Sequence, residues 1–149
     1  MKSLRLPRRI AFAAAICAFG TTVALADEQK FGHYTLHYSA FNADFLSPQI
    51  AQAYGIQRSK NRGVLNVTLT EQSANALPKP VEAELSATAI NVYQQVKPIK
   101  LRKLEDAGAV YYVAEFPVAD QELLNFQITA HRSGSEIGTV KFQKQFFTK

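Results

Sequence analysis

Cysteine and tryptophan are scarce in this chain of 149 residues, which has one cysteine, Cys17, and no tryptophan. A single cysteine cannot form an intramolecular disulfide, so the hydrophobic core has to stabilise the fold. The H-E-x-x-H pattern of zinc peptidases and the G-x-S-x-G pattern of serine hydrolases do not occur. These absences argue against a metal centre and against nucleophilic catalysis, and we expect no cofactor.

An excess of positive charge is also missing once the N-terminus is set aside. The chain has 17 basic and 12 acidic residues, but four of the basic ones are Lys2, Arg5, Arg8 and Arg9. Without these four, 13 basic residues face 12 acidic ones, a net charge of +1. A nearly neutral chain gives no case for nucleic-acid binding.

The first 26 residues have the pattern of a secretory signal peptide. The basic start is followed by an apolar run from Ile10, and Ala24-Leu25-Ala26 is a cleavage motif. We therefore predict that residues 1–26 are a cleaved signal peptide, cut between Ala26 and Asp27, and that residues 27–149 form one domain without a membrane anchor. Lipidation at Cys17 is the alternative, but Ile16 stands where lipoprotein signals carry a small residue.

Short alternating segments fill most of the remaining chain. Apolar and polar residues alternate within 33–38, 64–70, 81–96, 99–104, 109–116, 124–130 and 139–147, which predicts strands. The long segment 81–96 needs a bend near 86–91, and a helix over 82–89 is its rival interpretation. About seven strands with turn signals every 8–12 residues predict an all-β fold, an immunoglobulin-like antiparallel β-sandwich.

One short helix interrupts this pattern after the first predicted strand. Ser47 is a suitable N-cap, Pro48 suits the first helical position, and Gly55 suits the end of the helix. Ile50, Ala53 and Tyr54 form an apolar stripe. A helix this short needs packing, so we expect the stripe to lie on one end of the sheet core, beside Phe41, Phe45 and Leu46.

Several blocks of residues along the chain resemble a known family. They are Ser39-Ala40-Phe41-Asn42, Phe45-Leu46-Ser47-Pro48, Tyr54-Gly55-Ile56, Arg58-Ser59-Lys60, the run from Ala109 to Pro117, and the run from Phe142 to Phe147. These blocks resemble the sequences of an uncharacterised periplasmic family of Gram-negative bacteria, domain of unknown function 4426. The resemblance implies a periplasmic single-domain protein and supports the β-sandwich. It brings no activity and no functional residues.

The candidate binding residues lie in and around the loop after the helix. Arg58, Ser59, Lys60, Asn61 and Arg62 offer three cations and two polar side chains that suit an anionic group. Asn61 and Gly63 suggest a tight turn. The structural alternative is an exposed basic turn, or an Arg58–Asp44 ion pair that ties the loop down.

Two further candidates precede that basic run. Tyr54 belongs to the set as the largest residue of the helical stripe, and Asn42 as a loop polar residue. For Asn42 the alternative is a local side-chain hydrogen bond to backbone in an Asx-type turn.

The histidines give no further site. His33 and His37 would lie roughly 13 Å apart on a strand, too far for one metal ion. His131 lies near Ser133 and Ser135 in a predicted hairpin turn, where serine and glycine are turn formers. We therefore expect a protein that is not an enzyme.

Two functions fit these observations. The first is a monomeric, exported, non-enzymatic binding or accessory module that acts on an envelope protein or component, through loop residues or an open sheet edge. The alternative is a small anionic ligand-binding protein with a pocket under the helix from Pro48 to Tyr54.

Overall fold

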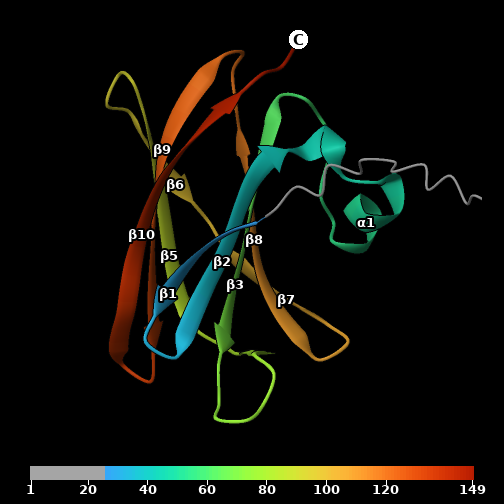
Figure 1. Cartoon of the computed structure of the whole chain (residues 1–149). Coiled ribbons are helices and arrows are strands. Elements are labelled where there is room, and N and C mark those ends of the chain that lie inside the picture. Colours follow the sequence, from blue (N-terminus) through green and yellow to red (C-terminus); the bar gives the residue numbers. More distant parts are fainter. Residues whose placement is uncertain (1–25) are drawn as a thin grey trace, which may run out of the picture.

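The computed structural model describes residues 26–149 and consists of two packed antiparallel sheets (Figure 1). The first sheet has the strand order β1-β2-β3-β8-β7, with β4 also paired to β3, and the second has the order β10-β9-β5-β6. The strands are β1 (Asp27–Phe31), β2 (Tyr34–Asn42), β3 (Arg62–Glu71), β4 (Lys79–Pro80), β5 (Glu84–Asn91), β6 (Val96–Ile99), β7 (Arg102–Asp106), β8 (Ala109–Pro117), β9 (Glu122–Arg132) and β10 (Ser135–Phe146).

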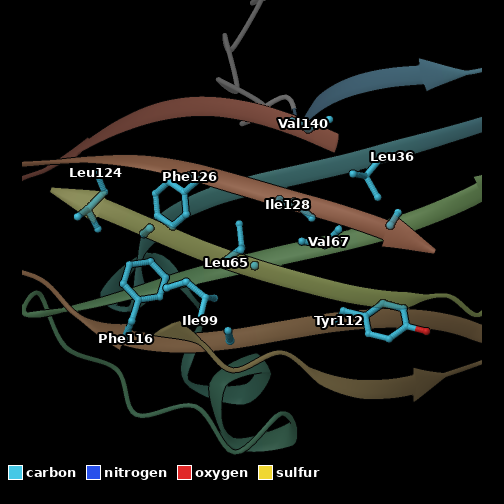
Figure 2. Close-up of a cluster of buried hydrophobic side chains, with 14 of the residues drawn as sticks. Leu36, Leu65, Val67, Ile99, Tyr112, Phe116, Leu124, Phe126, Ile128 and Val140 are labelled. Atoms are coloured by element: carbon cyan, nitrogen blue, oxygen red, sulfur yellow. The ribbon is translucent and has the colours of Figure 1, made fainter. Parts of the chain in front are cut away.

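The core lies between the two sheets. Alternate residues of β9, Leu124, Phe126, Ile128 and Ala130, point inward and are almost fully buried, as the sequence alternation predicted. They face Leu65 and Val67 of β3 and Leu36 of β2 across the sandwich. Figure 2 shows these side chains filling the space between the sheets, with Phe116 and Ile99 toward one end.

The predicted antiparallel β-sandwich is confirmed, with ten strands among residues 26–149 instead of about seven. The first strand, β1, was not predicted, and it pairs with β2 along its whole length. Phe31, the last residue of β1, lies directly over Gly138 of β10, because a Cβ atom at Gly138 would be 2.3 Å from its ring. Strand β1 therefore joins the two sheets on one side of the sandwich.

The segment 81–96 is where the sequence interpretation differs most from the structure. It contains strand β5, a turn at residues 92–95 and the first residue of β6. The bend expected near 86–91 is wrong, because residues 84–91 pair with β9 without interruption and the chain reverses only after Asn91. The rival helix over 82–89 is wrong, because residues 84–91 pair with β9. The next expected strand, 99–104, is divided between β6 and β7, where the chain passes from one sheet to the other.

The short helix α1 (Pro48–Ala53) follows a single 3-10 turn, η1 (Ala43–Phe45). Figure 1 shows α1 beside the sheet that contains β2, β3 and β8, away from β9 and β10. A second apolar cluster joins it to the outer face of that sheet: Ala43, Ala51 and Ile56 pack with Val64 and Val113. The expectation that the helix lies on one end of the sheet core is therefore wrong.

The buried face of α1 also differs from the predicted stripe. Ala51 is buried, whereas Ile50 and Ala53 are exposed and Tyr54 is half-buried. Phe45, expected to pack beside the helix, has 78% of its surface exposed. The orientation of this short helix follows from the packing of Ala51, and of Ile56 just after the helix, against the sheet.

The predicted signal peptide lies outside the described residues, apart from Ala26. Within residues 26–149 no helix is long and apolar enough to cross a membrane. Strand β1 begins at Asp27, the first residue after the predicted cleavage site.

Candidate functional site

Residues 43–61, which we call the helical flap, leave the end of β2 and return at the start of β3. Its helix begins as predicted: the Ser47 hydroxyl accepts a hydrogen bond from the backbone N–H of Ile50 at 3.2 Å, and Pro48 follows it. The helix ends at Ala53 with Tyr54 as its C-cap, and Gly55 follows with a φ of +63°. The N–H of Ile56 then donates to the carbonyl of Ala51 at 2.8 Å, which fixes the exit of the chain from the helix.

Arg58 ties two parts of the flap together from its exposed surface. Its Nε donates to the carbonyl of Leu46 at 2.7 Å and its Nη2 donates to the carbonyl of Asp44 at 3.0 Å. These are backbone acceptors, so the tie between Arg58 and Asp44 exists but does not involve the Asp44 carboxylate. A guanidinium with fixed geometry suits two such carbonyls, and it closes the flap into a loop.

Glu115 of β8 anchors the return of the flap to the sheet. Its carboxylate accepts from the backbone N–H of Gln57 at 3.3 Å and lies 3.5 Å from Nη1 of Arg62. Arg102 of β7 approaches the same carboxylate at 4.0 Å and also donates to the carbonyl of Tyr54. Glu115 was not among the predicted site residues. The sequence feature that could have identified it is a single carboxylate within the apolar run 109–116, at a position that faces away from the core.

Asn42 joins three segments that are far apart in the sequence. Its side-chain amide donates to the carbonyl of Lys60 at 2.8 Å and to the carbonyl of Phe147 at 3.0 Å. Asn42 is 94% buried, and its partners lie 18 and 105 residues away. The alternative of a local Asx-type turn is wrong, because this amide bonds to the flap and to the C-terminal tail.

The remaining polar residues of the basic run act locally. The Ser59 hydroxyl accepts from the backbone N–H of Asn61 at 3.1 Å. The carbonyl of Asn61 accepts from the N–H of Val118 at 3.0 Å. Gly63 lies in strand β3 rather than in a turn. A Cβ atom at this position would be 2.3 Å from the ring of Phe116, so the close packing of that ring requires glycine.

An open hollow of about 450 Å³ lies where β2, the flap and the C-terminal tail meet. We call it the terminal hollow; it is lined by Phe41, Asn42, Asp44, Phe45, Lys60, Lys144, Gln145, Phe147 and Lys149. Two of its aromatic rings are open to solvent, since Phe45 is 78% and Phe147 57% exposed. Three lysines and one aspartate line it. Lys149 also lies 3.2 Å from Asp120, so three positive charges face two negative ones.

A smaller cavity of about 160 Å³, the flap pocket, lies between the flap and the outer face of the first sheet. It is lined by Phe41, Leu46, Tyr54, Ile56, Val64, Asn66, Tyr111 and Val113. The hydroxyl of Tyr54 donates to Oδ2 of Asp106 at 3.5 Å. Burial, followed by the negative charge of Asp106, raises the pKa of Tyr54, so the phenol stays protonated.

The structure divides the seven predicted site residues among different roles. Asn42 and Lys60 line the terminal hollow, and Tyr54 lines the flap pocket. Arg58 and Arg62 are bound to carbonyls and to Glu115, so they do not join Lys60 in one anion site. Ser59 and Asn61 shape the turn between them. The lysines Lys144 and Lys149 were not predicted, because the C-terminal strand reaches this end only in the fold.

The histidines take part in surface contacts. His37 lies 3.1 Å from the Thr70 hydroxyl and 3.5 Å from Glu28, and His131 lies 4.0 Å from Glu136. Among residues 26–149 no group of three or more His, Cys, Asp or Glu side chains is placed to hold a metal ion.

The chain is thus a small antiparallel β-sandwich in which one long loop folds back as a helical flap over the outer face of a sheet. Its sequence matches the model of the domain of unknown function DUF4426 over residues 28–149, and the chain belongs to that family. A DUF4426 family protein from Pseudomonas aeruginosa is similar to it, with 36% identity and a TM-score of 0.71 over 83% of this chain and 96% of that one.

Two solved structures of FetP from a uropathogenic Escherichia coli strain are more distant. One has 9% identity and a TM-score of 0.57 over 84% of this chain and 95% of that one. The other, a copper-bound FetP variant, has 10% identity and a TM-score of 0.55 over 83% and 96% of the two chains. Identities this low show a shared fold alone. The comparison with curated proteins gives no match.

Proposed function

We propose that this protein is an exported, periplasmic, non-enzymatic module that binds an acidic segment of another envelope protein in the terminal hollow. The observation that carries the proposal is the pair of exposed rings of Phe45 and Phe147 beside three lysines, Lys60, Lys144 and Lys149. Single exposed apolar residues are ordinary, but apolar side chains gathered in one hollow and rimmed by polar residues are typical of an interaction site. Ammonium groups around them favour carboxylates on that partner.

Preorganisation supports the same surface. The amide of Asn42 bonds to the carbonyls of Lys60 and Phe147, so it fixes the backbone on two sides of the hollow. The Asp120 carboxylate binds the N–H of Thr148 at 2.9 Å and lies 3.2 Å from Nζ of Lys149. A surface whose backbone is already ordered loses less conformational entropy when a partner binds.

The open edge strand β7 is a weaker candidate for the contact. The free edge strand β7 carries Arg102, Lys103 and Glu105, and Lys103 pairs with Glu82 at 2.6 Å and with Glu105 at 2.8 Å. Charged side chains on an edge strand oppose pairing with another strand. The proposal therefore places the partner on the hollow.

Site-specific photocrosslinking in the periplasm tests the proposal. A photoreactive residue at position 45 or 147 should give one dominant adduct, and the crosslinked peptide should contain Asp or Glu beside apolar residues. Leu77 is the matched control, because it is 84% exposed in the loop that leaves the opposite end of β3. The double substitution Lys60→Glu and Lys144→Glu should reduce the adduct without changing the Tm. Equal adducts from position 77, or a basic crosslinked peptide, would contradict the proposal.

A further inference from the structure

The flap pocket is separate from the terminal hollow, with only Phe41 lining both. Seven of its eight lining residues are apolar or aromatic, and Asn66 of β3 is the exception. No Lys, Arg, His, Asp or Glu lines it. A charged ligand would therefore lose its hydration without gaining a counter-charge. The chemistry of the lining favours a neutral ligand over the anion that the sequence suggested.

Asn66 is an unusual residue for this position. It lies on the outer face of β3, two residues after the buried Val64, and its backbone pairs with Val113 on β8. Its Oδ1 atom is buried and has no hydrogen-bond partner within the described residues. Buried polar atoms normally have a partner, and an unpaired acceptor costs free energy. The oxygen is closed to solvent in this orientation, so a ligand in the pocket would pair with it after the amide turns.

The polar groups of Tyr54 beside the pocket are already engaged. The Tyr54 hydroxyl donates to Asp106, and the Tyr54 carbonyl accepts from Arg102. These contacts hold one wall of the pocket in place. Of the other lining residues, Asn66 and Tyr111 carry polar side-chain groups, and the Asn66 amide is the one whose oxygen is buried without a partner within the described residues.

We propose that the flap pocket binds a small, neutral, hydroxylated ring, whose hydroxyl group pairs with the side-chain amide of Asn66. An apolar cavity of about 150 Å³ is known to hold benzene, so a pocket of about 160 Å³ accommodates a single ring. The terminal torsion of asparagine is broad and roughly two-fold, so a half-turn of the amide brings Oδ1 to the position of Nδ2. A hydroxyl group both donates and accepts, and it pairs with either atom.

The proposal is tested on the chain that begins at Asp27 by NMR titration with three one-ring probes: phenol, toluene and benzoate. Phenol should give saturable shifts at Asn66, Tyr54 and Tyr111, and its Kd should be about 2–10-fold lower than that of toluene, the gain from one neutral hydrogen bond. Benzoate should bind more weakly than both. Equal affinity for phenol and toluene, tighter binding of benzoate, or no saturable shift with any probe would overturn the proposal.

The variant Asn66→Leu keeps the size of the side chain and removes the amide. It should abolish the preference for phenol while toluene still binds. Thr68→Val is the matched control, because Thr68 lies on the same face of β3 and does not line the pocket. An unchanged phenol-to-toluene ratio in Asn66→Leu would contradict the assignment of Asn66. The comparison of probes on the unmodified protein decides the proposal even if this variant does not fold. Neither result depends on crosslinking at the terminal hollow.

Discussion

The side chain of Asn42 donates a hydrogen bond to the backbone carbonyl of Phe147 at 3.0 Å, across 105 residues of sequence. Its second hydrogen goes to the carbonyl of Lys60. One buried amide therefore holds the end of β2, the end of the flap and the C-terminal tail. This contact positions two residues of the terminal hollow, Lys60 and Phe147, without itself needing a ligand.

Replacing this amide should be costly. Asn42→Asp places an acceptor-only carboxylate against two carbonyl oxygens in a buried site, and an unpaired buried polar group costs about 1–3 kcal/mol, with more for a charge. We expect the free energy of unfolding to fall by about 3 kcal/mol or more, measured by urea denaturation at pH 7. Asn61→Asp, at an exposed position in the same region, serves as the control and should cost little. A loss below about 0.5 kcal/mol in Asn42→Asp would show that the two hydrogen bonds of the Asn42 amide contribute little to stability.

Arg58 and Lys60 should respond differently to the same substitution. Arg58→Ala removes two hydrogen bonds to flap carbonyls and should lower the free energy of unfolding by about 1 kcal/mol, reduced from a larger value because the side chain is exposed. Lys60→Ala should leave stability unchanged within about 0.5 kcal/mol, because the Lys60 backbone carbonyl that bonds to Asn42 remains. Equal losses in the two variants would mean that Arg58 does not tie the flap.

Local patterns predicted the fold well where one face of a strand is buried. The alternation over 124–130 identified the inward side chains of β9. Successive side chains of a strand point to opposite faces, so a strand with one buried face has an apolar residue at every second position. Strand β1 escaped prediction because its sequence, DEQKF, is polar and its first four residues are exposed. The β5–β6 turn escaped because Val92 and Tyr93 are not turn residues. Asn91 forms this turn by accepting from the N–H groups of Tyr93 and Gln95, both at 3.0 Å.

The candidate site was less predictable because its contacts are long-range. The sequence marked Arg58 as a cation near Asp44, but only the fold shows that it binds carbonyls. Glu115 reaches the flap from β8, and Lys144 and Lys149 reach the terminal hollow from β10 and the C-terminal tail. No spacing in the sequence predicts these contacts. The glycine at position 63 looked like a turn residue, although it is there to make room for an aromatic ring.

That close approach gives a third prediction. Gly63→Ala puts a methyl group 2.3 Å from Cε2 of Phe116, and the ring cannot move freely because Phe126 and Phe146 pack against it edge-on at 5.6 and 5.7 Å. We expect a loss of about 1–3 kcal/mol from overpacking. A double-mutant cycle with Phe116→Leu checks the cause, since the smaller side chain should reduce the cost of Gly63→Ala. An equal cost in both backgrounds would point to backbone strain instead.

Processing at Ala26 should leave the sandwich complete. A mature chain that begins at Asp27 retains all of β1, including Phe31, which packs on Gly138. Intact-mass measurement of the protein from a periplasmic fraction should give an N-terminus at Asp27, and reductant should not change the Tm because Cys17 is removed. A lipid-modified Cys17, or a chain that keeps Met1, would contradict the predicted export route.

The C-terminal tail should loosen in acid through Asp120. The hydrogen bond from the Thr148 N–H, reinforced by Lys149, lowers the pKa of Asp120 below its ordinary value of 3.8, although partial burial opposes the shift. A carboxyl group with a lowered folded-state pKa stabilises the fold fully above the ordinary value, and that contribution is lost as the pH falls through the folded pKa.

The amide signal of Thr148, followed by NMR from pH 6 downward, should therefore titrate with a midpoint below 3.8. In Asp120→Asn the amide oxygen can still accept from Thr148, but the charge is gone, so the titration should disappear. A midpoint at or above 3.8, or the same profile in the variant, would contradict the role of Asp120.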